Sequence, residues 1–125
     1  MRLQFVYMVL VGIGGMAGCI LRYLTGVLVW PYKGTGFPWA TFWVNTSGCL
    51  AIGLMMGWIM RQPNWETGRL FLATGFCGGF TTFSAFSFEC LQLLRQQQYA
   101  LMSMYIAASL LACMLATALG FYITK

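Results

Sequence analysis

Four apolar stretches, each long enough to cross a bilayer as a helix, limit the possible folds of this chain more than any other feature. A helix of about 20 apolar residues spans the hydrocarbon core of a membrane. The apolar stretches cover residues 4–30, 39–60, 67–96 and 99–124. Short segments rich in proline, glycine or polar residues separate them and stop the helices. The sequence therefore predicts an all-α membrane protein that forms one four-span domain over residues 1–125.

The scarcity of charged side chains supports the membrane class. Charged residues make up 7% of the chain, whereas a soluble domain carries roughly a quarter. The basic residues are scattered, and a nucleic-acid-binding face would need them clustered. The chain has no histidine and only two acidic residues, which nearly excludes a zinc or di-iron site. Its five cysteines form no Cys-x-x-Cys pair, and we interpret them as small buried hydrophobic residues.

The basic residues show only a weak bias toward one side of the membrane. Four of them lie on the side of the termini: Arg2, Arg61, Arg69 and Lys125. The other side holds Lys33 and Arg95, with Arg22 buried toward that end of the first span. Four against two or three is a bias too weak to fix one orientation by the positive-inside rule. We therefore hypothesise that the chain inserts in both orientations and pairs as an antiparallel dimer. Glycines at helical spacing in the first two spans would allow close contacts in such an oligomer, although packing within one subunit explains any single glycine equally well.

Residues 75–89, with the sequence GFCGGFTTFSAFSFE, place paired glycines and several hydroxyl side chains inside the third apolar span. This span is about ten residues longer than a bilayer requires. Gly78-Gly79, followed by the β-branched Thr81-Thr82, favours a helix that is interrupted in mid-membrane. The carbonyl oxygens freed by a break would suit a small hard cation such as sodium. The alternative is an unbroken helix whose glycines allow close packing.

Phenylalanines recur at helical spacing through the same segment, at Phe76, Phe80, Phe83 and Phe86. Neighbours in this series are three or four residues apart, so each pair is expected to share a helix face. An aromatic stripe is usually a core or lipid contact. Here hydroxyl donors alternate with the rings, and the positive edge of a phenyl ring can face an anion. Such a lining offers the weak, repeated sites that ion conduction needs.

Polar residues are also embedded in the other three spans. Arg22 lies in the first span, where it either serves an aqueous vestibule or extends to the interface. Asn45 lies in the second span, with Thr41 one turn before it. Polar side chains recur every four residues in the fourth span, at Tyr105, Ser109, Cys113 and Thr117. Donors without acidic partners favour an anion path over a cation path.

Together these residues resemble the Fluc or CrcB family of small fluoride channels. The third span matches the family signature through Gly75-x-x-Gly78-Gly79-x-Thr81-Thr82-Phe83-Ser84-x-Phe86-Ser87-x-Glu89. The first span matches through Gly14-Gly15-x-x-Gly18-x-x-x-Arg22-Tyr23, and the second through Val44-Asn45-x-x-Gly48. The resemblance covers essentially the whole chain, and the TTFSxFS segment is highly specific. The nearest departure is Ala40, where the family has glycine.

The resemblance implies an antiparallel, dual-topology homodimer in a bacterial inner membrane, with two parallel fluoride pores. It assigns to the pore Thr41, Asn45, Thr82, Phe83, Ser84, Phe86, Tyr105, Ser109, Cys113 and Thr117. It places Arg22 and Glu89 at the vestibule, and the carbonyls of Gly78 and Thr81 from both subunits around a structural sodium ion. The identity of the transported ion, fluoride, rests on this resemblance alone.

Three other functions are alternatives to a channel. A small four-helix exporter of multidrug or guanidinium type, coupled to protons, fits the length and topology but needs a membrane-embedded carboxylate. The acids of this chain, Glu66 and Glu89, lie near the ends of the third span, which disfavours the exporter. A non-transporting assembly subunit would not explain the polar stripe of the fourth span. An enzyme is the least favoured, because no nucleophile–base pair or metal set is visible.

Overall fold

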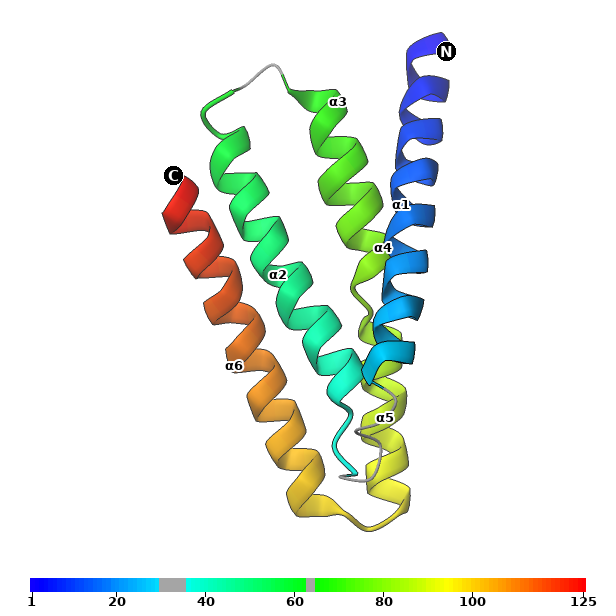
Figure 1. Ribbon diagram of the computed structural model, residues 1–125, viewed down its shortest axis with the longest axis vertical. Helices are drawn as coiled ribbons and strands as arrows, with labels where there is room; N and C mark the ends of the chain where they lie inside the picture. Colours follow the sequence, from blue (N-terminus) through cyan, green and yellow to red (C-terminus); the bar gives the residue numbers. More distant parts are fainter. Residues whose placement is uncertain (30–35, 63–64) are drawn as a thin grey trace.

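The structure, a computed structural model, describes residues 1–29, 36–62 and 65–125, and every regular element among them is a helix. Three spans are single helices: α1 (Arg2–Val29), α2 (Trp39–Ile59) and α6 (Tyr99–Thr124) (Figure 1). The third span, Glu66–Arg95, is divided into shorter pieces. All four are long and apolar enough to cross a membrane. The predicted class is therefore confirmed, and the chain is an integral, all-α membrane protein.

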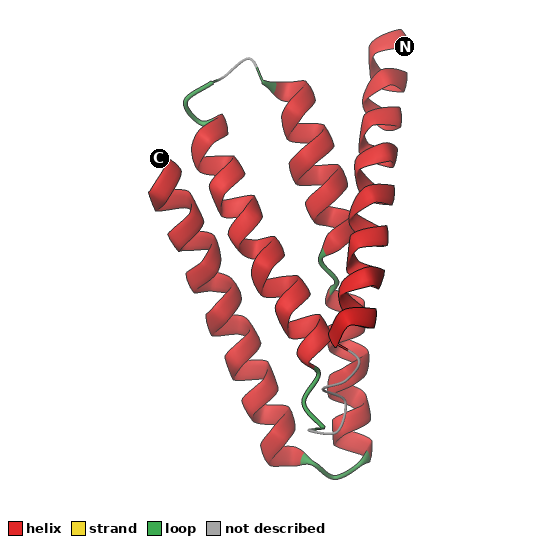
Figure 2. Cartoon of the chain, in the orientation of Figure 1, coloured by secondary structure: helices red, strands yellow, loops and turns green. Residues whose placement is uncertain are grey.

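The third span is interrupted, as predicted, but at the threonines rather than at the glycines. Its upper half comprises α3 (Glu66–Arg69), the π-helical segment η2 (Leu70–Cys77) and α4 (Gly78–Phe80). Its lower half is α5 (Phe83–Arg95). Thr81 and Thr82 between them are extended, with ψ angles of 156° and 113° (Figure 2). This agrees with the preference of β-branched residues for extended backbone, while both glycines stay helical.

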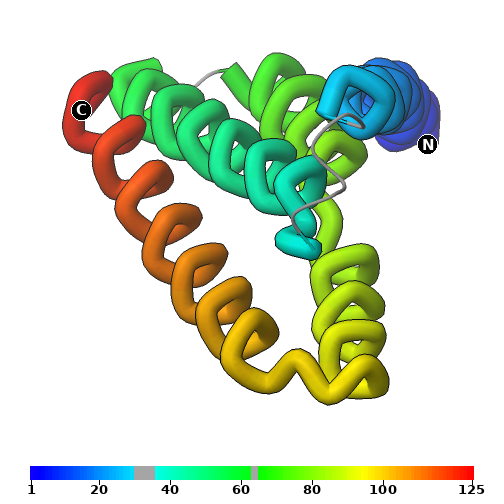
Figure 3. The backbone as a smooth tube through the Cα atoms, turned by 60° about the horizontal axis from the view of Figure 1, so that its bottom comes forward, coloured from blue at the N-terminus to red at the C-terminus, as the bar shows by residue number. Residues whose placement is uncertain are grey.

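The glycines of the third span serve close packing against α1. A Cβ atom added at Gly79 would lie 2.9 Å from the Cα of Gly15, and one at Gly75 would lie 2.8 Å from the carbonyl oxygen of Val11. Gly18 of α1 faces the backbone of Phe76 and Phe80 in the same way. Figure 3 shows α1 lying along the upper half of the third span, on the side away from α6. The two expectations for the glycines, a break and close packing, therefore both hold in part.

A second glycine contact joins α2 to α6, which lie side by side in Figure 1. Gly53 and Gly57 of α2 face the backbone of Thr117 and Phe121. A Cβ at Gly120 of α6 would lie 2.7 Å from the backbone nitrogen of Leu54. Small residues allow helix backbones to approach this closely in lipid. The fourth span is thereby fixed along the second.

Two sequence expectations are wrong. Phe80 and Phe83 do not share a helix face, because the extended threonines separate them: Phe80 is buried and stacks on Phe76, whereas Phe83 begins α5 with 76% of its surface exposed. The expectation of uniformly buried cysteines also fails, since Cys19 is exposed, although its Sγ donates to the Gly79 carbonyl at 3.4 Å, and only Cys77 is fully buried among the five. A helix with lipid-facing surface can expose a small apolar thiol at little cost.

Candidate functional site

The break in the third span is held by one side chain of α2. The Asn45 side chain donates from Nδ2 to the Thr82 carbonyl oxygen at 3.1 Å and accepts at Oδ1 from the Thr82 N–H at 2.8 Å. An unsatisfied backbone group inside a membrane costs several kcal/mol, so an interruption needs such partners. A single amide pairs both backbone groups of Thr82. The sequence placed Asn45 at the pore; the structure places it at the break itself.

The break also removes the backbone donors of the Gly78 and Thr81 carbonyls. In a continuous helix each carbonyl would accept a hydrogen bond from the N–H four residues later. The Thr82 N–H, which would donate to the Gly78 carbonyl, donates to Asn45 instead. The Ala85 N–H, which would donate to the Thr81 carbonyl, is taken by the Thr82 hydroxyl at 3.2 Å, capping α5. Arg22 Nη1 lies 3.4 Å from the Thr81 carbonyl oxygen. Arg22 therefore reaches the break and does not extend away to the interface.

A cavity of about 510 Å³, which we call the arginine cavity, lies on one side of the break. Four predicted site residues line it: Arg22, Thr41, Thr82 and Ser84. The Thr82 and Ser84 hydroxyls are 3.2 Å apart, and Ser84 is exposed. The Arg22 guanidinium group and the paired Thr82 and Ser84 hydroxyls give this cavity donors for an anion, whereas the Thr41 hydroxyl donates to Glu89. This position fits the predicted vestibule.

A groove of about 360 Å³, the phenylalanine groove, lies between α2, the third span and α6. Its predicted pore residues are Asn45, Thr82, Phe83, Phe86, Ser109 and Cys113, and it also reaches the predicted cation ligands Gly78 and Thr81. Thr82 lines both this groove and the arginine cavity, so the clamped break stands between the two. The structure thus brings together most of the residues that the sequence singled out.

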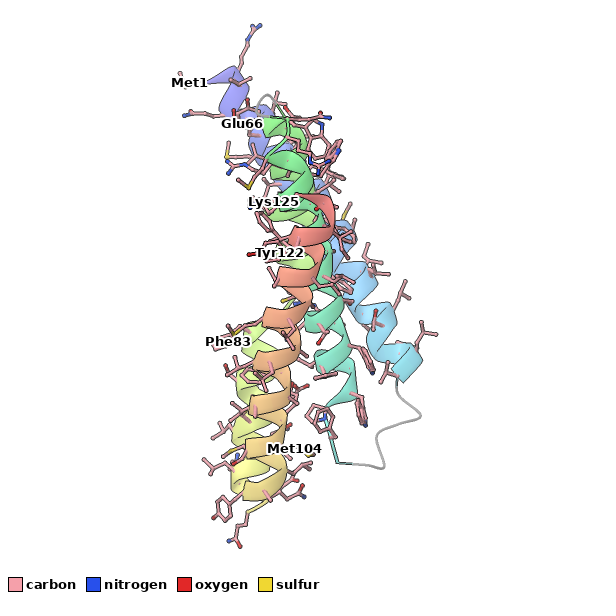
Figure 4. The ribbon with its side chains drawn as sticks, turned by 90° about the vertical axis from the view of Figure 1, so that its left-hand side faces the viewer. Met1, Glu66, Phe83, Met104, Tyr122 and Lys125 are labelled. Atoms are coloured by element: carbon pink, nitrogen blue, oxygen red, sulfur yellow. The ribbon has the colours of Figure 1, made fainter. Side chains whose placement is uncertain are left out.

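Phenyl rings and one unpaired hydroxyl line the phenylalanine groove together among the described residues. The Phe83 and Phe86 ring centroids are 5.6 Å apart, and Figure 4 shows Phe83 at the surface about halfway along the bundle. Ser109 is 6% exposed, yet its hydroxyl has no hydrogen-bond partner among the described residues. The buried Thr46 hydroxyl is likewise unpaired in the part of the chain that the structure describes. A buried hydroxyl without a partner is costly unless a further group, such as an ion or water, completes it.

A carboxylate-centred network lies at the lower end of the groove, and sequence reasoning missed it. Thr41 donates to Glu89 Oε1 at 2.6 Å, and the Tyr105 hydroxyl donates to Glu89 Oε2 at 2.7 Å. Tyr105 has no exposed surface, and the Phe86 ring packs on it with centroids 5.1 Å apart. Glu89 was expected near the end of its span, but it lies within α5. The clue was available: an acid inside an apolar span needs donors from its neighbours.

The residues of the predicted polar stripe of α6 lie in different surroundings and do not line one path. Ser109 and Cys113 line the phenylalanine groove, and Tyr105 binds Glu89 beside it. Thr117 lies beyond the groove, in a hollow with Gly53 of α2 that is otherwise lined by apolar residues. Cys49 of α2 lines the groove but was not singled out, although it lies one turn after Asn45 on the same face. Over residues 1–29, 36–62 and 65–125, no group of three or more metal-ligating side chains occurs.

Comparisons with known proteins agree with the resemblance seen in the sequence. A family model described as "CrcB-like protein, Camphor Resistance (CrcB)" matches residues 9–121. A protein of Flavobacterium psychrophilum named "Fluoride-specific ion channel FluC" is 44% identical over 116 residues, covering 92% of this chain and 94% of its own length. A protein of the same name from Chlorobaculum tepidum is 46% identical over 112 residues, covering 84% and 86%. On these matches, which run through all four spans, the chain belongs to the CrcB-like family.

Proposed function

We propose that the protein is a passive, fluoride-selective channel that exports fluoride across a bacterial inner membrane. Relatives that cover almost the whole chain are named fluoride-specific ion channels. The observation in this chain that carries the proposal is the phenylalanine groove, which Phe83 and Phe86 line together with Ser109, whose buried hydroxyl has no partner among the described residues. Ring edges and free hydroxyl donors are what a small anion needs when it gives up its water.

In this proposal the selectivity for fluoride and the rate of its passage both follow from the weakness of each contact between the ion and the groove. Phenyl edges carry partial positive charge, and hydroxyl protons add directional donors, but none of the described residues that line the groove has a positively charged side chain that would trap an anion. The only cation beside the break, Arg22, lines the neighbouring arginine cavity, within the residues that the structure describes. In this scheme Arg22 raises the local anion concentration at the entrance, and Glu89 fixes Tyr105 and Thr41 near the groove.

We further propose that two chains of opposite orientation form a homodimer with two parallel pores, as the weak bias in the distribution of basic residues suggests. The exposed Phe83 ring, which one chain leaves uncovered, would then face a second copy. Reporter fusions at the C-terminus should be active on both sides of the membrane. Activity on one side only would contradict the dual topology but not the channel function.

A structural sodium ion on the dimer axis is proposed at the Gly78 and Thr81 carbonyls. Both oxygens have lost the helical N–H donors that a continuous helix would supply, which fits oxygen coordination of a hard cation. Arg22 has to share or yield the Thr81 oxygen for this to occur. Replacing Na⁺ by N-methylglucamine should lower the thermal unfolding temperature of the purified protein. An unchanged temperature would argue against the ion.

The proposal is tested by halide efflux from liposomes containing the purified protein. Fluoride should leave rapidly and passively, chloride slowly. Phe83→Ile and Phe86→Ile should depress fluoride efflux, while Phe88→Ile, at an exposed position of α5 outside the groove, should not. Unchanged flux in both groove variants would remove the rings from the mechanism. Flux that requires a proton gradient would instead favour the exporter, with Glu89 as its carboxylate.

A further inference from the structure

Three of the five cysteines, Cys49, Cys77 and Cys113, line the phenylalanine groove as free thiols. Cys77 is 2% exposed, whereas Cys49 and Cys113 are half-buried and reach the groove. The proposed conduction path uses at most one of them, Cys113, as a polar position. The presence of several thiols on one lining raises the question of what else the groove can bind.

Cys49 and Cys113 are held opposite each other by the close packing of α2 and α6. Gly53 and Gly120 place the two helix backbones in contact within two turns of these cysteines. Gly53 meets the backbone of Thr117, and Cys49 and Cys113 each lie one turn before that contact and line the same groove. Cys77 lines the same groove from the third span. Two thiols on separate rigid helices therefore form a facing pair.

We propose that the Cys49–Cys113 pair is a binding site for one divalent thiophilic cation of the mercuric type. Soft cations prefer sulfur ligands, and a mercuric ion forms stable linear complexes with only two. Zinc normally requires four ligands, and the described residues offer no cluster of three or more metal-ligating side chains. The pair can therefore satisfy a two-coordinate ion and not a tetrahedral one.

Charge balance selects a divalent ion. When Hg²⁺ binds, two S–Hg bonds form, the two S–H protons leave to solvent, and no atom is oxidised or reduced. The resulting complex is neutral, so it carries little desolvation cost in a membrane. A monovalent ion such as Ag⁺ would leave one net negative charge between α2 and α6, which is far more costly there. If the Cys77 thiolate also bound Hg²⁺, the complex would likewise carry one net negative charge.

The site is tested in a variant that retains only the pair, Cys19→Ser/Cys77→Ser/Cys90→Ser. Titration of this purified variant with HgCl₂, followed by sulfur–mercury charge-transfer absorption and intact mass, should give one mercury per chain. Adding Cys49→Ser or Cys113→Ser should weaken retention against a competing monothiol by about 10²-fold, because the second sulfur acts as an intramolecular ligand. Equal retention in the single-thiol variants would overturn the site, as would mercury that bridges two chains on a non-reducing gel.

Wild-type protein provides a second readout if the multiple variant does not fold. One equivalent of HgCl₂ should protect Cys49 and Cys113 together from maleimide alkylation, as mapped by peptide mass spectrometry. Protection of neither, or of one without the other, contradicts the pair.

The consequence for transport rests on the proposed function. Mercury in the groove should slow fluoride efflux from liposomes, and a dithiol should restore it. A protein that shows no fluoride efflux before mercury is added fails the proposed function, while the titration still decides the site. Full efflux with mercury bound would place the pair off the fluoride path.

Discussion

The two halves of the third span are held in opposite ways. The upper half, residues 66–80, packs backbone against backbone on α1, and Gly75, Cys77 and Phe80 are buried within it. In the lower half, α5, only Leu93 is fully buried, and Phe83 and Phe88 are 76% and 59% exposed. The upper half is held by close backbone packing, which its glycines allow because they have no side chain. The lower half is held by polar side-chain contacts from α2 and α6.

This difference shows how one apolar segment can be fixed to a neighbouring helix in its upper half and line a groove in its lower half. The glycine contacts bring the helix backbones together, so the upper half has no room to shift against α1. The position of the upper half therefore fixes where the break lies. Below the break, α5 is held by Asn45, Thr41 and Tyr105 through hydrogen bonds. Its rings and hydroxyls are left free to face a groove. Four substitutions test this comparison, from the largest expected effect to the smallest.

Asn45→Ala removes the junction between the two halves. The Thr82 N–H and carbonyl both lose their side-chain partner, so the free energy of unfolding should fall by about 3 kcal/mol. Reversible unfolding in sodium dodecyl sulfate, followed by circular dichroism, measures this. Ser47→Ala is the matched control on α2, because among the described residues the Ser47 hydroxyl donates only to carbonyls of its own helix, at Trp43 and Val44. Equal losses in the two variants would show that the break does not depend on Asn45.

Gly18→Ala tests the close packing of α1 against the upper half of the third span. The new Cβ would lie 2.7 Å from the backbone nitrogen of Phe80 and closer still to the Phe76 carbonyl. Backbone atoms cannot move aside as a flexible side chain can, and we expect a loss of about 2 kcal/mol in the same unfolding experiment. Gly12→Ala on the same helix meets nothing within 4 Å and should be neutral or stabilising. Similar behaviour of the two variants would contradict the described α1 contact.

Tyr105→Phe loosens the lower half alone. It removes one donor to Glu89 and should cost about 1.5 kcal/mol. Hydrogen exchange should become faster in the amides of α5 and not in those of η2 and α4, since the upper half is held by α1. Tyr122→Phe, at a side chain that is 71% exposed on α6, is the control. Faster exchange throughout the third span would mean that its halves are not independent.

Ser109→Ala should have the smallest effect on stability and separates stability from transport. Its hydroxyl is unpaired among the described residues, so its removal should change the free energy of unfolding by less than about 0.5 kcal/mol. If the hydroxyl serves an ion in the groove, fluoride efflux should fall about fivefold, the equivalent of one hydrogen bond. Ser103→Ala, exposed on α6, should alter neither quantity. Unchanged efflux in Ser109→Ala would remove this hydroxyl from the proposed path.

Much of the site could be predicted from sequence because membrane constraints act locally. Asn45, Thr82, Phe83, Phe86, Ser109 and Cys113 were all singled out as polar or aromatic residues in an apolar setting, and they line one groove. Thr117 shares the four-residue spacing of its stripe but lies outside that groove. Helical spacing gives the face of a residue and its height on the helix, but not what the neighbouring helix offers at that height.

The sequence by itself determined the four apolar spans, their all-α character and the presence of an interruption in the third, because a bilayer leaves a chain few other ways to satisfy its backbone. Only the tertiary structure decided that the interruption falls at Thr81 and Thr82, that Asn45 closes it, and that Glu89 binds Thr41 and Tyr105. These contacts join residues 16 to 48 positions apart. Their geometry depends on how closely the glycines let the helices approach, which no single span encodes.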